Sequence, residues 1–275
     1  MTMVKGLASG RDRGAAHPPD QATGTARRPS VDALRFRQSI STAFQPIVDV
    51  PRRTIFAQEA LVRGAGGESA ASVLGAVAER DRHAFDLCCQ VTAVETAARL
   101  GVPGMISINL MPNAVSEVGY CLENIVTTAE RAGVPASRLM FEMTESERIG
   151  DCALLRRIFA EYRRLGFSTA IDDFGAGFAG LQMLADLQPD LPDILKIDMG
   201  LIRGVDTDRA RHTIVGGICE TARKLGLRVI GEGIETEGER DALLEMGIAL
   251  QQGFLFARPV FEGWIAPEAL DGLPA

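Results

Sequence analysis

Short hydrophobic runs that end in polar residues recur along this chain, which is the pattern of strands in an α/β protein. The first two runs, Ala43–Val50 and Thr54–Arg63, are separated by Pro51-Arg52-Arg53, and this spacing predicts a β-hairpin. Further strands are predicted over Gly104–Met111, Arg138–Thr144, Ser168–Asp172, Ile194–Asp198, Arg228–Glu232 and Ala249–Phe256.

Stretches with helical periodicity lie between these runs. Apolar residues at helical spacing predict an amphipathic helix over 154–165. Helices are also predicted over 69–100, over 121–132, from about 179, around 214–225, and after Thr236, which forms a capping-box pattern with Glu239. Strands and helices therefore alternate from 54 to 256, which predicts an α/β fold of the (β/α)8 TIM-like barrel type. The hairpin allows the first strand to run antiparallel to the others.

Composition sets the domain boundaries. Residues 1–30 are rich in Ala, Gly, Pro, Arg and Thr and have no hydrophobic period, so we expect a disordered N-terminal tail. Of the 275 residues 46% are hydrophobic, which is enough for one large core, and we expect one folded domain over 31–275.

The net charge and the cysteine and histidine content exclude several classes of function and of metal site. The net charge of −7 and the absence of a basic patch argue against binding to a nucleic-acid polymer. Five scattered cysteines without a C-x-x-C pair predict reduced thiols in a cytoplasmic protein. No apolar run reaches the ~18 residues of a membrane span, and the N-terminus lacks the core of a signal peptide. Three dispersed histidines do not suit zinc, so a metal here would be a hard ion bound by oxygen.

Most of the predicted strands end in polar residues that a hydrophobic core does not require. In a parallel barrel these ends meet on one rim. Several carboxylates facing one another stay ionised only if cations lie among them, which suits one or two Mg²⁺ or Mn²⁺ ions. Two such ions about 3.5–4 Å apart would clamp a phosphodiester and activate a water. The residues are Glu59, Asn109, Glu142, Asp172 with Asp173, Lys196 with Asp198, Glu232, and Gln252.

Each of these residues has a simpler interpretation when it is taken singly. Glu59 and Glu142 can cap the helices that follow them, and Asn109 can form a turn. Asp172-Asp173 can serve equally as a helix cap or as metal ligands. Lys196 is harder to explain structurally, because an ammonium inside a barrel needs an anion nearby. The recurrence at equivalent positions favours a functional site.

Eight motifs in one order resemble the EAL-domain cyclic di-GMP phosphodiesterases, and they span roughly 39–261. The tripeptide that names the family is Glu59-Ala60-Leu61. Its companions are Phe44–Asp49 (FQPIVD), Ser107–Leu110 (SINL), Phe141–Ser146 (FEMTES), Asp172–Leu181 (DDFGAGFAGL), Leu195–Asp198 (LKID), Gly231–Thr236 (GEGIET) and Gln252–Pro259 (QGFLFARP).

The resemblance implies a role for each matching residue. One metal would be held by Glu59, Asn109, Glu142 and Asp172, and a second by Asp172, Asp173 and Glu232. Lys196 would orient or help activate the attacking water. The implied catalytic residues are Lys196, Glu232, Glu235 and Glu145, the last of which would position the loop after Asp173. The implied substrate-binding residues are Gln45, Arg63, Asp198 and Gln252.

The implied reaction is the opening of cyclic di-GMP to linear pGpG in bacterial signalling, with two Mg²⁺ or Mn²⁺ ions per site and Ca²⁺ as an inhibitor. A homodimer is also implied, whereas no upstream sensor or regulatory partner is identified. Two alternatives stay open. One is a catalytically silent EAL domain that binds cyclic di-GMP or a protein, and the other is an unrelated magnesium-dependent barrel enzyme.

One segment departs from the family pattern. Leu187–Leu195 is about three residues longer than the usual spacing between the paired aspartates and the lysine. The extra residues either loop out below the rim or shift Lys196 and the dimer surface.

Overall fold

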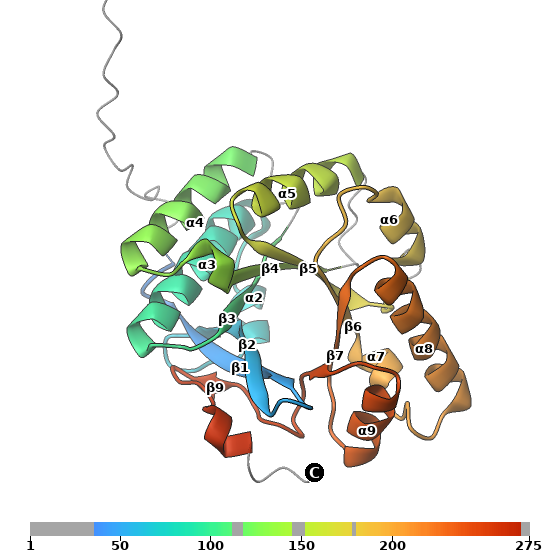
Figure 1. The fold of residues 1–275 in the computed structure, drawn as a ribbon. Helices are drawn as coiled ribbons and strands as arrows, with labels where there is room; N and C mark the ends of the chain where they lie inside the picture. The colour runs from blue at the N-terminus through green and yellow to red at the C-terminus, as the bar shows by residue number, and fades with distance from the viewer. Residues whose placement is uncertain (1–35, 112–117, 145–151, 178–179, 271–275) are drawn as a thin grey trace, which may run out of the picture.

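A closed barrel of strands with helices around it forms the body of the protein in the computed structural model, which describes residues 36–111, 118–144, 152–177 and 180–270 (Figure 1). The predicted tail, 1–30, lies outside these ranges. The strands are β1 (Ile40–Asp49), β2 (Thr54–Gly64), β3 (Met105–Asn109), β4 (Leu139–Thr144), β5 (Ser168–Phe174), β6 (Ile194–Ile197), β7 (Arg228–Gly231), β8 (Leu250–Gln251) and β9 (Val260–Phe261).

The strand order confirms the predicted barrel. Strands β2 to β8 follow one another in parallel, and β1 closes the ring because it pairs antiparallel with both β2 and β8. The antiparallel first strand and its hairpin are therefore present. The short strand β9 adds to the edge of β1, where Ala43 pairs with Phe261.

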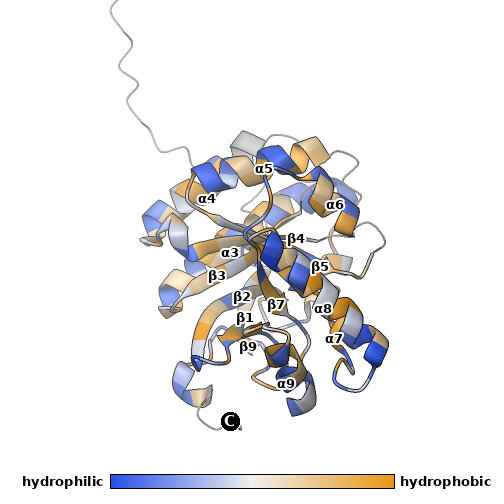
Figure 2. Ribbon diagram, turned by 45° about the vertical axis from the view of Figure 1, so that its right-hand side comes forward, coloured by the Kyte–Doolittle hydropathy of each residue, from blue (hydrophilic) through white to orange (hydrophobic). Residues whose placement is uncertain are grey.

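The helices are α2 (Ala70–Gly75), α3 (Arg82–Leu100), α4 (Val118–Ala132), α5 (Cys152–Arg164), α6 (Gly180–Asp186), α7 (Met199–Ile202), α8 (Arg209–Lys224) and α9 (Glu237–Glu245). Short 3₁₀ turns cover Glu79–Asp81, Ala136–Arg138 and Pro267–Leu270. Figure 2 shows hydrophilic and hydrophobic residues alternating along α5, α6 and α8, as expected for helices with one face on the barrel and one in solvent.

Two predicted elements differ from the structure. The helix expected over 69–100 is interrupted, because Ala78 takes an extended conformation between α2 and α3. The strand expected over 249–256 is only β8, two residues long. After β8 the chain bonds instead to the loop around Ile234, where Ile234 N donates to the carbonyl of Gln252 and Leu255 N donates to that of Ile234.

Apolar side chains form two layers around the sheet. The larger layer lies between the strands and the helices, and it includes the edge-to-face pair Phe141 and Tyr162. The smaller layer fills the floor of the barrel, and its buried members are Ile47, Ala57, Met140, Ala170, Ile194, Ile230 and Leu250. Because apolar side chains fill this end of the barrel, the polar residues above them are accessible only from the other end.

Within the described ranges, no helix has both the length and the apolar character needed to cross a membrane. Cys88, Cys89, Cys152 and Cys219 are free thiols, in agreement with the prediction for these four residues.

Candidate active site

A polar layer lies directly above the apolar floor, and strand geometry explains why. Side chains two residues apart point to the same face of a strand. Each floor residue of a parallel strand is followed two positions later by a polar residue, as in Ala170 and Asp172 or Ile194 and Lys196. The same step gives Glu59, Ser107, Glu142, Glu232 and Gln252, and in the antiparallel β1 it runs backward from Ile47 to Gln45.

Lys196 stands at the centre of this layer and is fully buried. Its Nζ lies 2.7 Å from Glu142 Oε2, 2.8 Å from Asp172 Oδ1 and 2.7 Å from Glu232 Oε1. One ammonium therefore contacts three carboxylates that come from three different strands or strand ends. The sequence prediction that this lysine needs an anion is confirmed.

The negative charge exceeds what Lys196 can balance. Burial raises the pKa of Glu142 to about 8. The charge of Lys196 lowers this pKa, whereas the charges of Glu59 and Asp172 raise it further. Burial likewise raises the pKa of Glu232 well above its ordinary value. For Lys196 burial alone would lower the pKa, but the surrounding carboxylates raise it well above the usual value. The lysine is thus protonated, and the remaining negative charge of the carboxylates favours the binding of protons or cations.

Glu59 sits at the edge of the cluster within a network of amides. Its Oε1 accepts a hydrogen bond from Asn109 Nδ2 at 3.1 Å, and its Oε2 accepts one from Gln252 Nε2 at 2.6 Å. Gln252 also lies 3.4 Å from Gln45 Oε1, and Gln45 donates to the carbonyl of Ala257 at 3.1 Å. Gln252 Oε1 is buried and accepts no hydrogen bond from the described residues.

Asp173 reaches the same site although it follows Asp172 directly. Successive residues of a regular strand point to opposite faces, but Asp173 has a φ of 54° and the β5–β6 register shifts between Ile171 and Phe174. This irregularity turns the second carboxylate back toward the rim. Burial, Asp172 and Asp198 together raise the pKa of Asp173.

The carboxylates gather into two groups that share Asp172. Oxygens of Glu59, Glu142 and Asp172 lie within 4.8 Å of one another, and so do oxygens of Asp172, Asp173 and Glu232. An oxygen-only donor set with raised carboxylate pKa values fits hard divalent cations. These are the two ligand sets that the sequence resemblance implies, apart from Asn109, whose amide donates to Glu59.

Other predicted residues make hydrogen bonds or ion pairs with residues outside the Lys196 cluster. Asp198 caps α7 through Gly200 N at 2.8 Å, and Glu235 Oε1 lies 2.9 Å from an Arg203 nitrogen. Arg63 lies near the carboxyl end of β2 and donates to the carbonyl of Val62. Glu145 lies outside the described residues, so its predicted role has no structural counterpart here.

The sequence analysis assigned no role in the site to three residues of this region. Ser107 donates a hydrogen bond from its hydroxyl to Glu142 Oε1. It stands two residues before Asn109 on the same strand, so the period of two could have revealed it. Arg203 and Glu239 contact the loop that carries Glu232, and only the capping-box pattern hinted at Glu239.

The longer segment, 187–195, leaves Lys196 in place. Lys196 keeps its pairing with Ile230 in the β6–β7 ladder. The segment itself lies at the amino ends of the strands, where Asp193 N donates to the carbonyl of Thr169 and Arg228 N donates to that of Asp193. Of the two expectations, the structure favours extra residues below the rim.

Comparison with solved structures gives the same barrel. A standalone versatile EAL protein from Vibrio cholerae in its c-di-GMP-bound form is 42% identical, with a TM-score of 0.78 over 84% of this chain and 97% of that one. The manganese and cyclic di-GMP complex of Klebsiella pneumoniae BlrP1 is 33% identical, with a TM-score of 0.75 over 82% of this chain and 57% of that one.

Curated relatives are longer than this chain. The blue light- and temperature-regulated antirepressor BluF of Escherichia coli is 34% identical over 80% of this chain and 54% of its own length. The cyclic di-GMP phosphodiesterase RocR of Pseudomonas aeruginosa is 30% identical over 60% of this chain and 41% of its own length. This chain thus spans about half the length of these relatives or less. The family model for the EAL domain matches residues 31–259, and the chain belongs to the EAL-domain family.

Proposed function

We propose that this protein is an active phosphodiesterase that opens cyclic di-GMP to linear pGpG. The observation that carries the proposal is the pair of carboxylate groups around Lys196, which share Asp172. A domain that only bound the ligand would have no need to keep five acidic side chains within this cluster against their mutual repulsion.

Glu59, Asn109, Glu142 and Asp172 would hold one Mg²⁺ or Mn²⁺ ion, and Asp172, Asp173 and Glu232 would hold the other. Bound there, the ions would supply Lewis acidity toward the phosphate and lower the pKa of the attacking water. Ser107 keeps Glu142 oriented through its hydroxyl. Asn109 and Gln252 do the same for Glu59.

Lys196 acts as a hydrogen-bond donor in this proposal. Its raised pKa keeps the ammonium protonated, so it orients the water or the phosphate and does not remove a proton. The water oxygen forms the new bond to phosphorus, the bond from phosphorus to the 3′-oxygen breaks, and that oxygen takes up a proton from bulk water. Glu232, which contacts Lys196, takes the proton that the water loses.

Substrate contacts are proposed for residues around this centre. Arg63 lies four residues beyond Glu59 on the same face of β2, about 13 Å further along the strand, where it can meet a phosphate or a guanine. Gln252 Oε1 is free to accept from a ligand, and Gln45 is its neighbour. Asp198, Glu235 and Glu145 are proposed as supporting residues.

Two similar structures support the proposed substrate and the proposed metal. A third relative favours a second candidate function. The Vibrio cholerae and Klebsiella pneumoniae structures contain cyclic di-GMP, and one contains manganese. BluF is named as an antirepressor, which favours a domain that acts by binding a partner. Turnover separates the two functions.

The test is hydrolysis of cyclic di-GMP by the purified chain with Mg²⁺, Mn²⁺ or Ca²⁺, beside two variants. We expect pGpG with Mg²⁺ or Mn²⁺ and inhibition by Ca²⁺. Glu59→Ala should reduce kcat at least ~100-fold because it removes a ligand. Glu130→Ala on α4, an exposed carboxylate, should leave kcat unchanged.

The outcomes are distinct. Cyclic di-GMP binding without turnover would favour the receptor function. Turnover of another phosphate ester, but not of cyclic di-GMP, would point to an unrelated substrate. Turnover that survives Glu59→Ala would contradict the proposed site.

We also propose that the protein forms a homodimer through α6 and acts in the cytoplasm. Leu181 on α6 has the highest exposed fraction, 60%, among the exposed large apolar side chains of the described residues, and we place it in this contact. Four free thiols fit a reducing compartment. Cell fractionation would test the location, and recovery in the membrane or secreted fraction would contradict it.

A further inference from the structure

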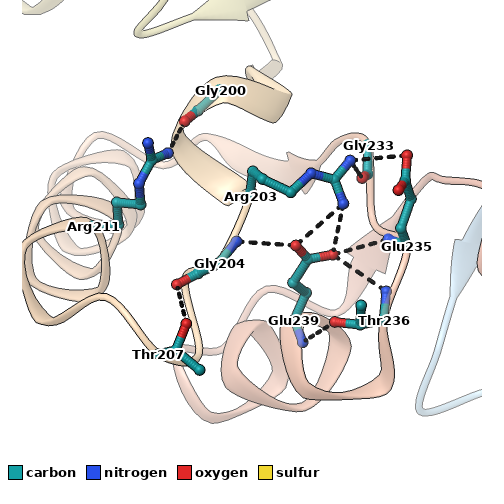
Figure 3. Close-up of polar contacts among 9 residues, drawn as sticks. All are labelled: Gly200, Arg203, Gly204, Thr207, Arg211, Gly233, Glu235, Thr236 and Glu239. Carbon is teal, nitrogen blue, oxygen red and sulfur yellow. Dashed lines mark hydrogen bonds and ion pairs between the residues drawn. The ribbon is translucent and has the colours of Figure 1, made fainter.

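The loop after β7 carries Glu232 at its first position and continues to Thr236, the N-cap of α9. Its first residue belongs to the candidate site, and Glu235 points toward Arg203 (Figure 3). Gly233 has a φ of 70° and packs on Met199, whose Cβ would lie 2.4 Å from a Cβ at that position. Such a loop holds one conformation only if its polar groups are fixed from outside.

Arg203 provides one part of this support. Its Nη2 donates to the carbonyl of Gly233 at 3.1 Å and a guanidinium nitrogen lies 2.9 Å from Glu235 Oε1. Its Nη1 lies 3.3 Å from each carboxylate oxygen of Glu239. One planar side chain thus contacts the loop at two points and the helix after it at a third.

Glu239 provides the other part. It is 2% exposed, and its Oε2 accepts from the backbone N–H of Glu235 at 2.9 Å and of Thr236 at 3.2 Å. Its Oε1 accepts from Gly204 N at 3.0 Å. Burial would raise the pKa of Glu239, but these backbone N–H groups and Arg203 lower it, so the carboxylate is charged at neutral pH.

These contacts join two connections of the barrel. Arg203 follows α7 in the connection that leaves β6, whereas Glu239 lies in the connection that leaves β7. The same two strands bring Lys196 and Glu232 to 2.7 Å inside the rim. We propose that Arg203 and Glu239 are positioning residues, which hold the Gly233–Thr236 backbone and thereby fix the Glu232 carboxylate against Lys196 and its proposed metal.

This inference rests on the proposed function, and its test uses Mn²⁺ binding without substrate. Mn²⁺ is titrated calorimetrically into the metal-stripped full chain and into three variants. Glu232→Gln identifies the binding phase that depends on this carboxylate. Arg203→Gln should weaken that same phase about tenfold and leave the other phase unchanged.

Arg211→Gln is the matched control. Arg211 also bonds a backbone carbonyl of α7, that of Gly200, but it does not contact the Glu232 loop (Figure 3). It should bind Mn²⁺ like the unmodified chain. Thermal unfolding without metal is compared in parallel, since general destabilisation would weaken both phases together.

Two results would overturn the inference. If Glu232→Gln loses a phase but Arg203→Gln does not, Arg203 does not position Glu232, and the proposed function is unaffected. If Glu232→Gln also binds Mn²⁺ normally, Glu232 holds no metal and the metal assignment falls with the inference.

If Arg203→Gln does not fold, Arg203→Lys replaces it. This variant keeps the charge, but a single nitrogen cannot reach Gly233, Glu235 and Glu239 together. It should weaken the Glu232-dependent phase by a smaller factor, and an unchanged phase would contradict the inference.

Discussion

A single buried ammonium, that of Lys196, partly offsets the charge of three carboxylates at the centre of the barrel. Removing one partner of a buried ion cluster is costly because the remaining charges stay desolvated. In the absence of metal, the stability of the folded protein therefore depends on Lys196. The proposed reaction depends on the same residue.

We predict that Lys196→Met destabilises the metal-free protein by roughly 3–5 kcal/mol at pH 8.5 and by less at pH 6. The pKa of Glu142 is about 8 in the folded protein, above its ordinary value, so the folded state binds more protons than the unfolded state. Stability from such a group falls as pH rises toward the folded pKa. Without Lys196 this fall should be steeper.

Urea unfolding in EDTA at the two pH values measures the effect. Lys224→Met is the control, because its pair with Glu220 is exposed and should contribute little. A loss of the same size at both pH values would contradict the prediction.

At the residue scale, the sequence predicted the members of the cluster better than their partners. A carboxylate at a strand end, such as Glu142, is visible as a break in an apolar run. The partner Ser107 lies in β3, and Arg203 lies beyond α7 and belongs to no alternating pattern. Contacts between different strands depend on the order of the strands in the sheet. That order cannot be inferred from the identity of a single residue.

Among the elements, β8 and the chain after it depend on glycine. Gly253 lies against the backbone of Ile234, so a methyl group added at Gly253 would lie 2.1 Å from the carbonyl oxygen and 2.3 Å from the nitrogen of Ile234. Backbone atoms cannot move aside as a flexible side chain can. The Ile234 loop and the Gln252 amide would both be displaced by any larger residue.

We predict that Gly253→Ala lowers the free energy of unfolding by about 3 kcal/mol or more, because of this overlap. Gly217→Ala in α8 is the counterpart, since no atom lies within 4 Å of its added methyl. It should be neutral or stabilise by up to about 1 kcal/mol. Chemical denaturation of both variants measures the difference, and equal effects would refute the explanation.

Hydrophobic periodicity correctly predicted the helices and strands that bury one face. It did not predict the places where backbone conformation ends or interrupts an element. The hairpin, the parallel strands and the amphipathic α5 follow from apolar spacing. The interruption at Ala78 and the two-residue β8 follow from local backbone geometry that no hydrophobic pattern records.

For the whole molecule, the two ends of the barrel carry different features. The carboxylate cluster lies at the carboxyl ends of the strands, whereas the longer segment 187–195 lies at the amino ends, where Arg163 donates to the carbonyl of Leu191. The sequence identified the departure, but only the strand ladder shows that it lies away from Lys196.

We predict that Leu181→Arg converts a homodimer into a monomer, because it places a charge in the proposed α6 contact. Light scattering after size-exclusion chromatography measures the mass. Leu74→Arg on α2, which is similarly exposed at 47%, should leave the dimer intact. A monomeric unmodified chain, or a dimer that tolerates Leu181→Arg, would contradict the proposed interface.

The antiparallel β1 has a consequence for biogenesis. It is synthesised early with its hairpin partner β2, but its other neighbour, β8, follows about 200 residues later in the chain. Until then the outer edge of the hairpin exposes unpaired backbone groups and apolar side chains to other nascent chains. Ring closure therefore waits for β8, so a chain that stops before Leu250 leaves the strands β1 and β7 as two unpaired edges.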